Sequence, residues 1–131
     1  MTIYALSSGP GLAGISVIRV SGSDTKKVIL KLTNKELPEP RVASRRKINK
    51  IEDNKLIDEG ILIWFPGPRS YTGEDMAEFH VHGSKAVVDA IHASLSIIDG
   101  CRLAEPGEFT KIAFQNGKIN LLKAESISDL I

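Results

Sequence analysis

The sequence predicts an α+β fold, in which a mixed or antiparallel sheet packs with helices. Strand-like and helix-like segments are mixed along 131 residues, which is enough chain for one domain with its own core. The clearest pair of strand candidates, residues 41–51 and 56–65, is joined by a short turn at Asp53-Asn54. Because so short a turn joins antiparallel neighbours, we expect a hairpin here and not a doubly wound parallel sheet.

The first third of the chain predicts two strands and a helix. Ile3–Leu6 is a short apolar segment, and Ile15–Val20 is β-branched, as is typical of strands. The glycine-rich residues 9–14 between them predict a loop. Residues 23–24 (Ser-Asp) offer N-caps for a helix that ends near Leu32 and turns its apolar side chains inward.

The part of the chain that follows the hairpin predicts a third long strand and a helix. Pro66-Gly-Pro68 interrupts the sheet, and a polar loop then leads to a strand over Met76–His82. The most regular helical pattern covers Ser84–Asp99, where apolar residues recur every four positions until Gly100 ends the helix. Cys101–Ala104 predicts a short strand.

The C-terminal segment predicts two further helices. Pro106 suits the first position of a helix that runs to about Gln115 and is closed by Gly117. Asn120 is a suitable cap for a last helix, whose apolar residues are still periodic at Ile131. Because this helix has no C-terminal signal, we expect the sequence to belong to a longer protein.

Composition limits the possible compartment and partners. The net charge is +1, but residues 26–55 hold ten of the seventeen Lys and Arg against four acids. The single Cys101 excludes an internal disulfide and is typical of a reducing compartment. No apolar run approaches the roughly 20 residues that span a bilayer, and the N-terminus lacks the pattern of a signal peptide. We therefore expect a cytoplasmic protein without membrane association.

Several motifs are better explained by ordinary structure than by chemistry. Gly9-x-Gly11-x-x-Gly14 matches a dinucleotide-binding fingerprint, but a strand follows it where the pyrophosphate needs a helix N-terminus, so a turn is the better interpretation. His80-Val-His82 points two imidazoles to one face of a strand, yet no full metal-ligand set accompanies them. Cys101 lacks a neighbouring His and is interpreted as a small buried residue.

Two nucleic-acid or nucleotide activities are also weighed against the sequence. The basic stretch 26–55 suits RNA phosphates, but no aromatic residue interleaves it, so a solvated basic face is favoured over an RNA-contacting module. No P-loop sequence is present, so this chain is not expected to hydrolyse GTP.

Glu78 is the most conspicuous charged residue on a predicted strand. It alternates with Ala77 and Phe79, which are expected to face the core, and a carboxylate on a central strand is costly if it is buried unpaired. Its two oxygens suit a ligand with two adjacent N–H donors, such as a pterin, a guanine or a guanidinium group. The alternative is an ion pair with Arg19, which rises from an otherwise apolar strand.

Six short motifs, in order and covering nearly the whole chain, resemble the N-terminal domain of the tRNA modification GTPase family called MnmE or TrmE. Each motif is weak alone, and the combination is highly specific. The motifs are Gly14-Ile-Ser-Val-Ile-Arg-Val-Ser-Gly22, Trp64-Phe-Pro-Gly-Pro68, Tyr71-Thr-Gly-Glu-Asp75, His82-Gly83, Pro106-Gly-Glu-Phe109 and Ala113-Phe-Gln-Asn-Gly-Lys118.

The resemblance implies a fold, a cofactor and a site. The fold would be similar to the folate-binding domain of aminomethyltransferases, and the cofactor would be a reduced folate, 5-formyl-tetrahydrofolate. Matching the family's folate-binding positions onto this chain implies Arg19, Glu78 and Lys118 as the binding residues, with no catalytic or metal-binding residue. Residues 1–118 would form the folate-binding and dimerisation domain, and residues 119–131 would begin a helical domain.

The resemblance also implies partners for the complete protein. It would form a homodimer and work with the flavoprotein MnmG (GidA) to modify the wobble uridine (U34) of certain tRNAs, with GTP, Mg and K bound only in a GTPase domain beyond this chain. Two alternatives remain open: a dimerisation or docking domain without folate, and an RNA-contacting module that uses residues 26–55.

Overall fold

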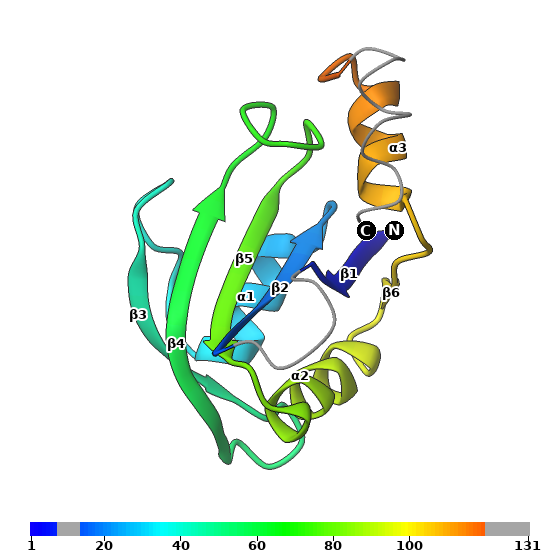
Figure 1. Ribbon diagram of the computed structural model, residues 1–131. Coiled ribbons are helices and arrows are strands. Elements are labelled where there is room, and N and C mark those ends of the chain that lie inside the picture. Colours follow the sequence, from blue (N-terminus) through cyan, green and yellow to red (C-terminus); the bar gives the residue numbers. More distant parts are fainter. Residues whose placement is uncertain (8–13, 120–131) are drawn as a thin grey trace.

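A computed structural model describes residues 1–7 and 14–119, which form one mixed six-stranded sheet and three helices (Figure 1). The strand order is β3-β4-β5-β2-β1-β6. All neighbouring strands are antiparallel except β1 and β6, which are parallel. The fold class is therefore α+β, as the sequence predicts. The strands are β1 Thr2–Leu6, β2 Ile15–Ser21, β3 Ser44–Asn49, β4 Leu56–Phe65, β5 Met76–His82 and β6 Cys101–Leu103, and the helices are α1 Thr25–Thr33, α2 Lys85–Ser96 and α3 Glu108–Gln115.

The predicted hairpin is confirmed as the antiparallel pair β3–β4. Its second strand has the predicted bounds, whereas the first is shorter than predicted at both ends and covers Ser44–Asn49. Arg41 adopts a left-handed conformation with φ 63°, which is incompatible with a regular strand there. Asn54, in the turn, is also left-handed, with φ 62°, and this is a conformation that Asn tolerates better than most residues.

Two predicted helix bounds are wrong by a few residues. The helix α2 ends at Ser96, and not at Asp99, because Ile97 already serves as its C-cap. The helix α3 begins at Glu108, and not at Pro106, because Gly107 takes the N-cap position with φ 75°. The glycine-rich loop is described only at Gly14, and the predicted helix from Asn120 lies outside the described residues.

The main core lies between one face of the sheet and the helices α1 and α2. Alternate residues of the strands point into it, as the two-residue period of a strand requires. The helix α1 lies behind the sheet in Figure 1. The most deeply buried members of this core, all 0% exposed, are Ile18, Val20, Val28, Ile29, Leu32, Ile48, Leu62, Ala77, Phe79, Ile91 and Leu95.

The opposite face of the sheet is covered only at one end. There α3 contributes Phe109, which packs with Ile3 of β1 and Met76 of β5 in a smaller apolar cluster. Farther along the same face, side chains of β2 and β5 remain partly exposed, and Ile15 is 61% exposed. We call this partly covered side, which carries Arg19, Glu78 and His80, the open face. None of the described helices is long and apolar enough to cross a membrane.

Candidate functional site

Arg19 and Glu78 meet on the open face. They are directly opposed in the register of β2 and β5, and Arg19 Nη2 lies 3.4 Å from Glu78 Oε2. Their side chains are only 24% and 20% exposed. The ion pair that the sequence offered as the alternative interpretation is therefore present. At 3.4 Å it is longer than a tight charge-assisted hydrogen bond of about 2.7–2.9 Å, so neither group is saturated by the other.

Two aromatic rings lie close to the guanidinium of Arg19. Its central carbon lies 5.4 Å from the ring centroid of Tyr71 and 5.9 Å from that of Phe109, within the range of cation–π attraction. Arg19 Nε is buried, and no described atom accepts its hydrogen. A buried donor without an acceptor is costly, and the charged pair therefore retains an unused N–H.

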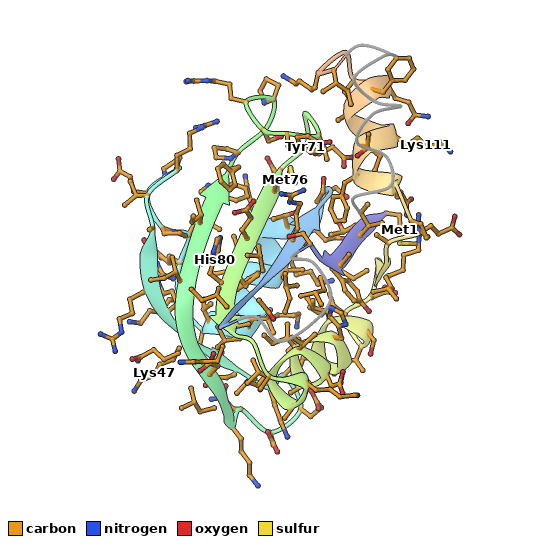
Figure 2. All side chains as sticks on the ribbon, in the orientation of Figure 1. Met1, Lys47, Tyr71, Met76, His80 and Lys111 are labelled. Carbon is orange, nitrogen blue, oxygen red and sulfur yellow. The ribbon has the colours of Figure 1, made fainter. Side chains whose placement is uncertain are left out.

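His80 is the second partner of Glu78. Its Nε2 lies 3.0 Å from Glu78 Oε1, two residues along the same strand and on the same face. His80 also lines a cavity of about 190 Å³ together with Gly60 and Ile61 of β4 and Ile15 of β2. Figure 2 shows His80 midway along the sheet, with Met76 and Tyr71 toward its upper end.

His82, the other histidine of the strand, has a different partner. Its Nδ1 lies 2.9 Å from Asp58 Oδ1, and its backbone N–H donates to the same carboxylate. Burial alone would raise the pKa of Asp58, but these hydrogen bonds from His82 lower it. Within the described ranges, no group of three His, Cys, Asp or Glu side chains is arranged to hold a metal ion.

Hydrogen bonds connect the loop before β5 to α3 and to the residue that follows it. Tyr71 Oη lies 3.1 Å from Thr110 Oγ1, and Asn116 Nδ2 donates to the carbonyl of Thr72 at 2.7 Å. Thr72 Oγ1 in turn lies 2.8 Å from Ser21 Oγ of β2. Two segments that are distant in sequence, residues 71–79 and 105–118, are thus brought against each other beside Arg19.

Lys118 lies at the edge of this arrangement. Its backbone N–H donates to the carbonyl of Ala113, which places Lys118 just after the end of α3. Its side chain lies against the loop, since a Cβ added to Gly73 would come within 3.1 Å of Lys118 Cε. In the described part of the chain, Lys118 forms no ion pair with Glu78. The fold therefore joins Arg19 and Glu78 directly, and it brings Lys118 to the loop that carries Tyr71.

Sequence reasoning missed three residues of this site: Tyr71, Phe109 and His80 in its role as a partner of Glu78. Tyr71 and Phe109 stand in two of the motifs that carry the family resemblance, Tyr71-Thr-Gly-Glu-Asp75 and Pro106-Gly-Glu-Phe109, and His80 shares a face with Glu78 by strand periodicity. Those signals name the residues as candidates. Their contacts with Arg19 and Glu78 depend on strand pairing and on the position of α3, which the sequence does not reveal.

The family described as GTP-binding protein TrmE N-terminus matches residues 2–118. The chain is 76% identical, over its whole length, to 30% of a tRNA modification GTPase MnmE from Pelagibacter ubique. It is 51% identical over 99% of its length to 28% of an MnmE from Phenylobacterium zucineum. It is 49% identical over 99% of its length to 26% of a mitochondrial 5-taurinomethyluridine tRNA synthase subunit from Danio rerio. The chain thus spans less than a third of the length of these relatives.

Proposed function

The chain belongs to the family of TrmE N-terminal domains, and from this premise we propose that it binds a reduced folate and forms a homodimer within a tRNA modification GTPase. The proposed ligand is a folate of the 5-formyl-tetrahydrofolate type, held by Arg19, Glu78 and Lys118. The names of the relatives support the tRNA modification role. The folate role is supported by the chemistry of the open face.

The observation that carries the folate proposal is the unsaturated Arg19–Glu78 pair. Both side chains are mostly buried, and Arg19 Nε has no acceptor among the described atoms. An ionised carboxylate offers about four acceptor positions, so Glu78 retains capacity for the two adjacent N–H donors of a pterin edge. Arg19 and Lys118 supply donors for carbonyl or carboxylate oxygens. This donor and acceptor set fits a reduced folate, which supplies a one-carbon unit when it is bound.

Titration calorimetry with 5-formyl-tetrahydrofolate tests this proposal. A charge-assisted contact contributes about 1.5–3 kcal/mol, so Glu78→Gln and Lys118→Ala should each weaken binding roughly tenfold or more. Lys111→Ala is the matched control, because Lys111 is an exposed lysine of the same helix region, and Figure 2 labels it on the far side of α3. Parent-like affinity in both site variants would exclude these residues from the site.

The functions of the longer protein are proposed from the same family membership. GTP, Mg²⁺ and K⁺ are assigned to a GTPase domain outside this chain, and the assembly with MnmG and tRNA is assigned to the complete protein in the cytoplasm. The homodimer is tested by sedimentation equilibrium of this chain, with and without folate. A monomer at all concentrations under both conditions would remove dimerisation from the proposed role of the domain.

A second candidate function, contact with RNA phosphates, is favoured by one observation. A cavity of about 400 Å³ is lined by Lys35 after α1 and by Arg45 and Lys47 of the edge strand β3. Arg45 is paired with Glu59, which also lines this cavity and reduces its positive charge. Basic residues also protect an edge strand from aggregation, so the charge alone does not assign an RNA role.

The RNA contact is tested by the salt dependence of tRNA binding. Each phosphate contact contributes a slope of about −0.9 in log affinity against log salt for a duplex. Lys47→Glu should therefore reduce the magnitude of the slope by about 1, whereas Lys111→Glu, on the opposite side of the molecule in Figure 2, should leave it unchanged. Equal slopes in all three proteins would exclude this cavity as an RNA contact.

A further inference from the structure

The contact between His80 and Glu78 identifies which imidazole nitrogen carries a proton. His80 Nε2 lies 3.0 Å from Glu78 Oε1. An ionised carboxylate only accepts hydrogen bonds, so His80 Nε2 must be the donor in this contact. Neutral His80 is therefore held in the tautomer that is protonated on Nε2, with Nδ1 as the acceptor.

Glu78 receives one donor on each of its two oxygens. His80 approaches Oε1, and Arg19 Nη2 approaches Oε2 at 3.4 Å. These two contacts, one to each oxygen, fix the orientation of the carboxylate group. Since each oxygen accepts about two hydrogen bonds, one position on each oxygen is left for a further donor.

We propose that His80 is a positioning residue for Glu78, which keeps this carboxylate oriented toward a ligand with two adjacent N–H donors. The inference rests on the proposed folate function and adds a residue that the family's three folate positions do not include. Without His80, the carboxylate is free to rotate toward Arg19 and form a two-pronged ion pair. A bidentate ion pair is especially favourable between arginine and a carboxylate, and in it Arg19 would compete with the ligand for both oxygens of Glu78.

The surroundings of His80 support this role. The rings of Tyr71 and Phe109 lie near the guanidinium of Arg19 and restrict its movement. The orientation of the Glu78 carboxylate therefore depends on its other partner, His80, which contacts Oε1. The strand β4 lies directly against the backbone of His80, because a Cβ added to Gly60 would lie 2.3 Å from the carbonyl oxygen of His80. His80 also borders the cavity of about 190 Å³, as His82 does, so a ligand effect that comes only from lining this cavity should appear at both histidines.

His82 provides a matched control within the same strand. It is two residues from His80, on the same face, and it also contacts a carboxylate, but that carboxylate is Asp58. Its side chain is 76% exposed. A general effect of removing an imidazole from this strand should appear in both histidine variants, whereas an effect through Glu78 should appear only at His80.

The experiment measures the affinity of this chain for 5-formyl-tetrahydrofolate by calorimetry. His80→Leu should weaken binding roughly tenfold, as the loss of an orienting hydrogen bond to a charged group does. His80→Gln, whose amide can donate from nearly the same position, should restore most of the affinity, and His82→Leu should bind like the parent. In a Glu78→Gln background, His80→Leu should cause no further loss, because the two residues act on one contact.

The outcomes separate this inference from the proposed function. A parent chain that binds no reduced folate would contradict both. A parent that binds, with His80→Leu binding equally well, would overturn the positioning role alone, as would equal losses at His80 and His82. Nitrogen–proton correlation spectra of the free chain give a readout that needs no variant to fold: neutral His80 should carry its proton on Nε2, and a proton on Nδ1 would overturn the inference.

Discussion

The two faces of the central sheet use neighbouring residues of the same strand for different purposes. In β5, Phe79 is 0% exposed and lies in the main core under the helices, whereas Glu78 and His80 on the open face stay partly exposed and contact each other. Because alternate residues of a strand point to opposite faces, one seven-residue segment contributes both to the core and to the candidate site. Stability and binding should therefore be separable by substitutions at adjacent positions.

The largest expected effect comes from Phe79. Replacing this fully buried ring with alanine leaves a cavity in the main core, so Phe79→Ala should lower the free energy of unfolding by about 3–5 kcal/mol. Glu78→Gln, one residue away, should change it by about 0.5–1.5 kcal/mol, since the amide of glutamine has nearly the shape of the carboxylate and keeps an oxygen that can accept from Arg19 or His80. Urea denaturation measures both free energies of unfolding. Similar decreases in the two variants would contradict the inference that one face of β5 provides stability and the other provides the binding site.

Gly60 should give the next largest effect, because it ties β4 to the backbone of β5. The Cβ of Gly60→Ala would lie 2.3 Å from the carbonyl oxygen of His80, and backbone cannot yield as a flexible side chain does. We expect a loss of about 1–3 kcal/mol, as in other overpacked sites. Gly14→Ala is the control, because a Cβ there meets no atom of the described residues within 4 Å. Thermal unfolding that is unchanged in Gly60→Ala would show that the two strands are not held this closely.

Tyr71 offers a smaller and more selective test on the open face. Tyr71→Phe removes the hydroxyl contact with Thr110 of α3 but keeps the ring over Arg19, so unfolding should become easier by about 0.5–1.5 kcal/mol. Folate affinity should be retained in Tyr71→Phe and reduced in Tyr71→Ala, which loses the ring as well. If calorimetry found equal affinity in both variants, the ring would not contribute to the site.

The pH dependence of the free energy of unfolding should report on His92, which lies in the helix α2 on the opposite side of the sheet from the open face. Burial lowers the pKa of His92 in α2, whose ring lies 5.4 Å from that of Tyr4. The unfolded chain binds a proton at this group more readily, so the stability is complete above a pH of about 6.5 and is lost as the pH falls toward the folded pKa. Unfolding free energies between pH 7 and pH 5, values chosen around the ordinary pKa of about 6.5 for histidine, should decline in the parent chain.

A variant isolates this histidine. His92→Phe should flatten the decline, since it removes the group that takes up the proton. The lowered pKa values of Asp58 and Glu108 affect stability at a more acidic pH than His92 does. Both carboxyls contribute their full stabilisation above their ordinary pKa values of 3.8 and 4.5, and this contribution is lost only as the pH falls below those values. A decline of the same steepness in parent and variant would assign the effect to another group.

Much of the fold was predictable from local pattern. The bounds of β4 and β5 follow from β-branched and alternating residues between clear breakers, and the short turn at Asp53-Asn54 makes β3 and β4 neighbours. The helix ends were less predictable. The helix α3 begins at Glu108 and not at Pro106, because Gly107 takes the N-cap position in a left-handed backbone conformation that local sequence preferences do not specify.

By itself, the sequence determined the alternation that sets Phe79 apart from Glu78 and the motifs that place the chain in its family. Only the tertiary structure decided the strand order, the parallel pairing of β1 with β6, and the partners of the charged residues. The physical reason is range. Turn, capping and periodicity preferences act within a few residues, whereas Arg19 meets Glu78, Tyr71 and Phe109 through strand pairing and helix packing across the fold.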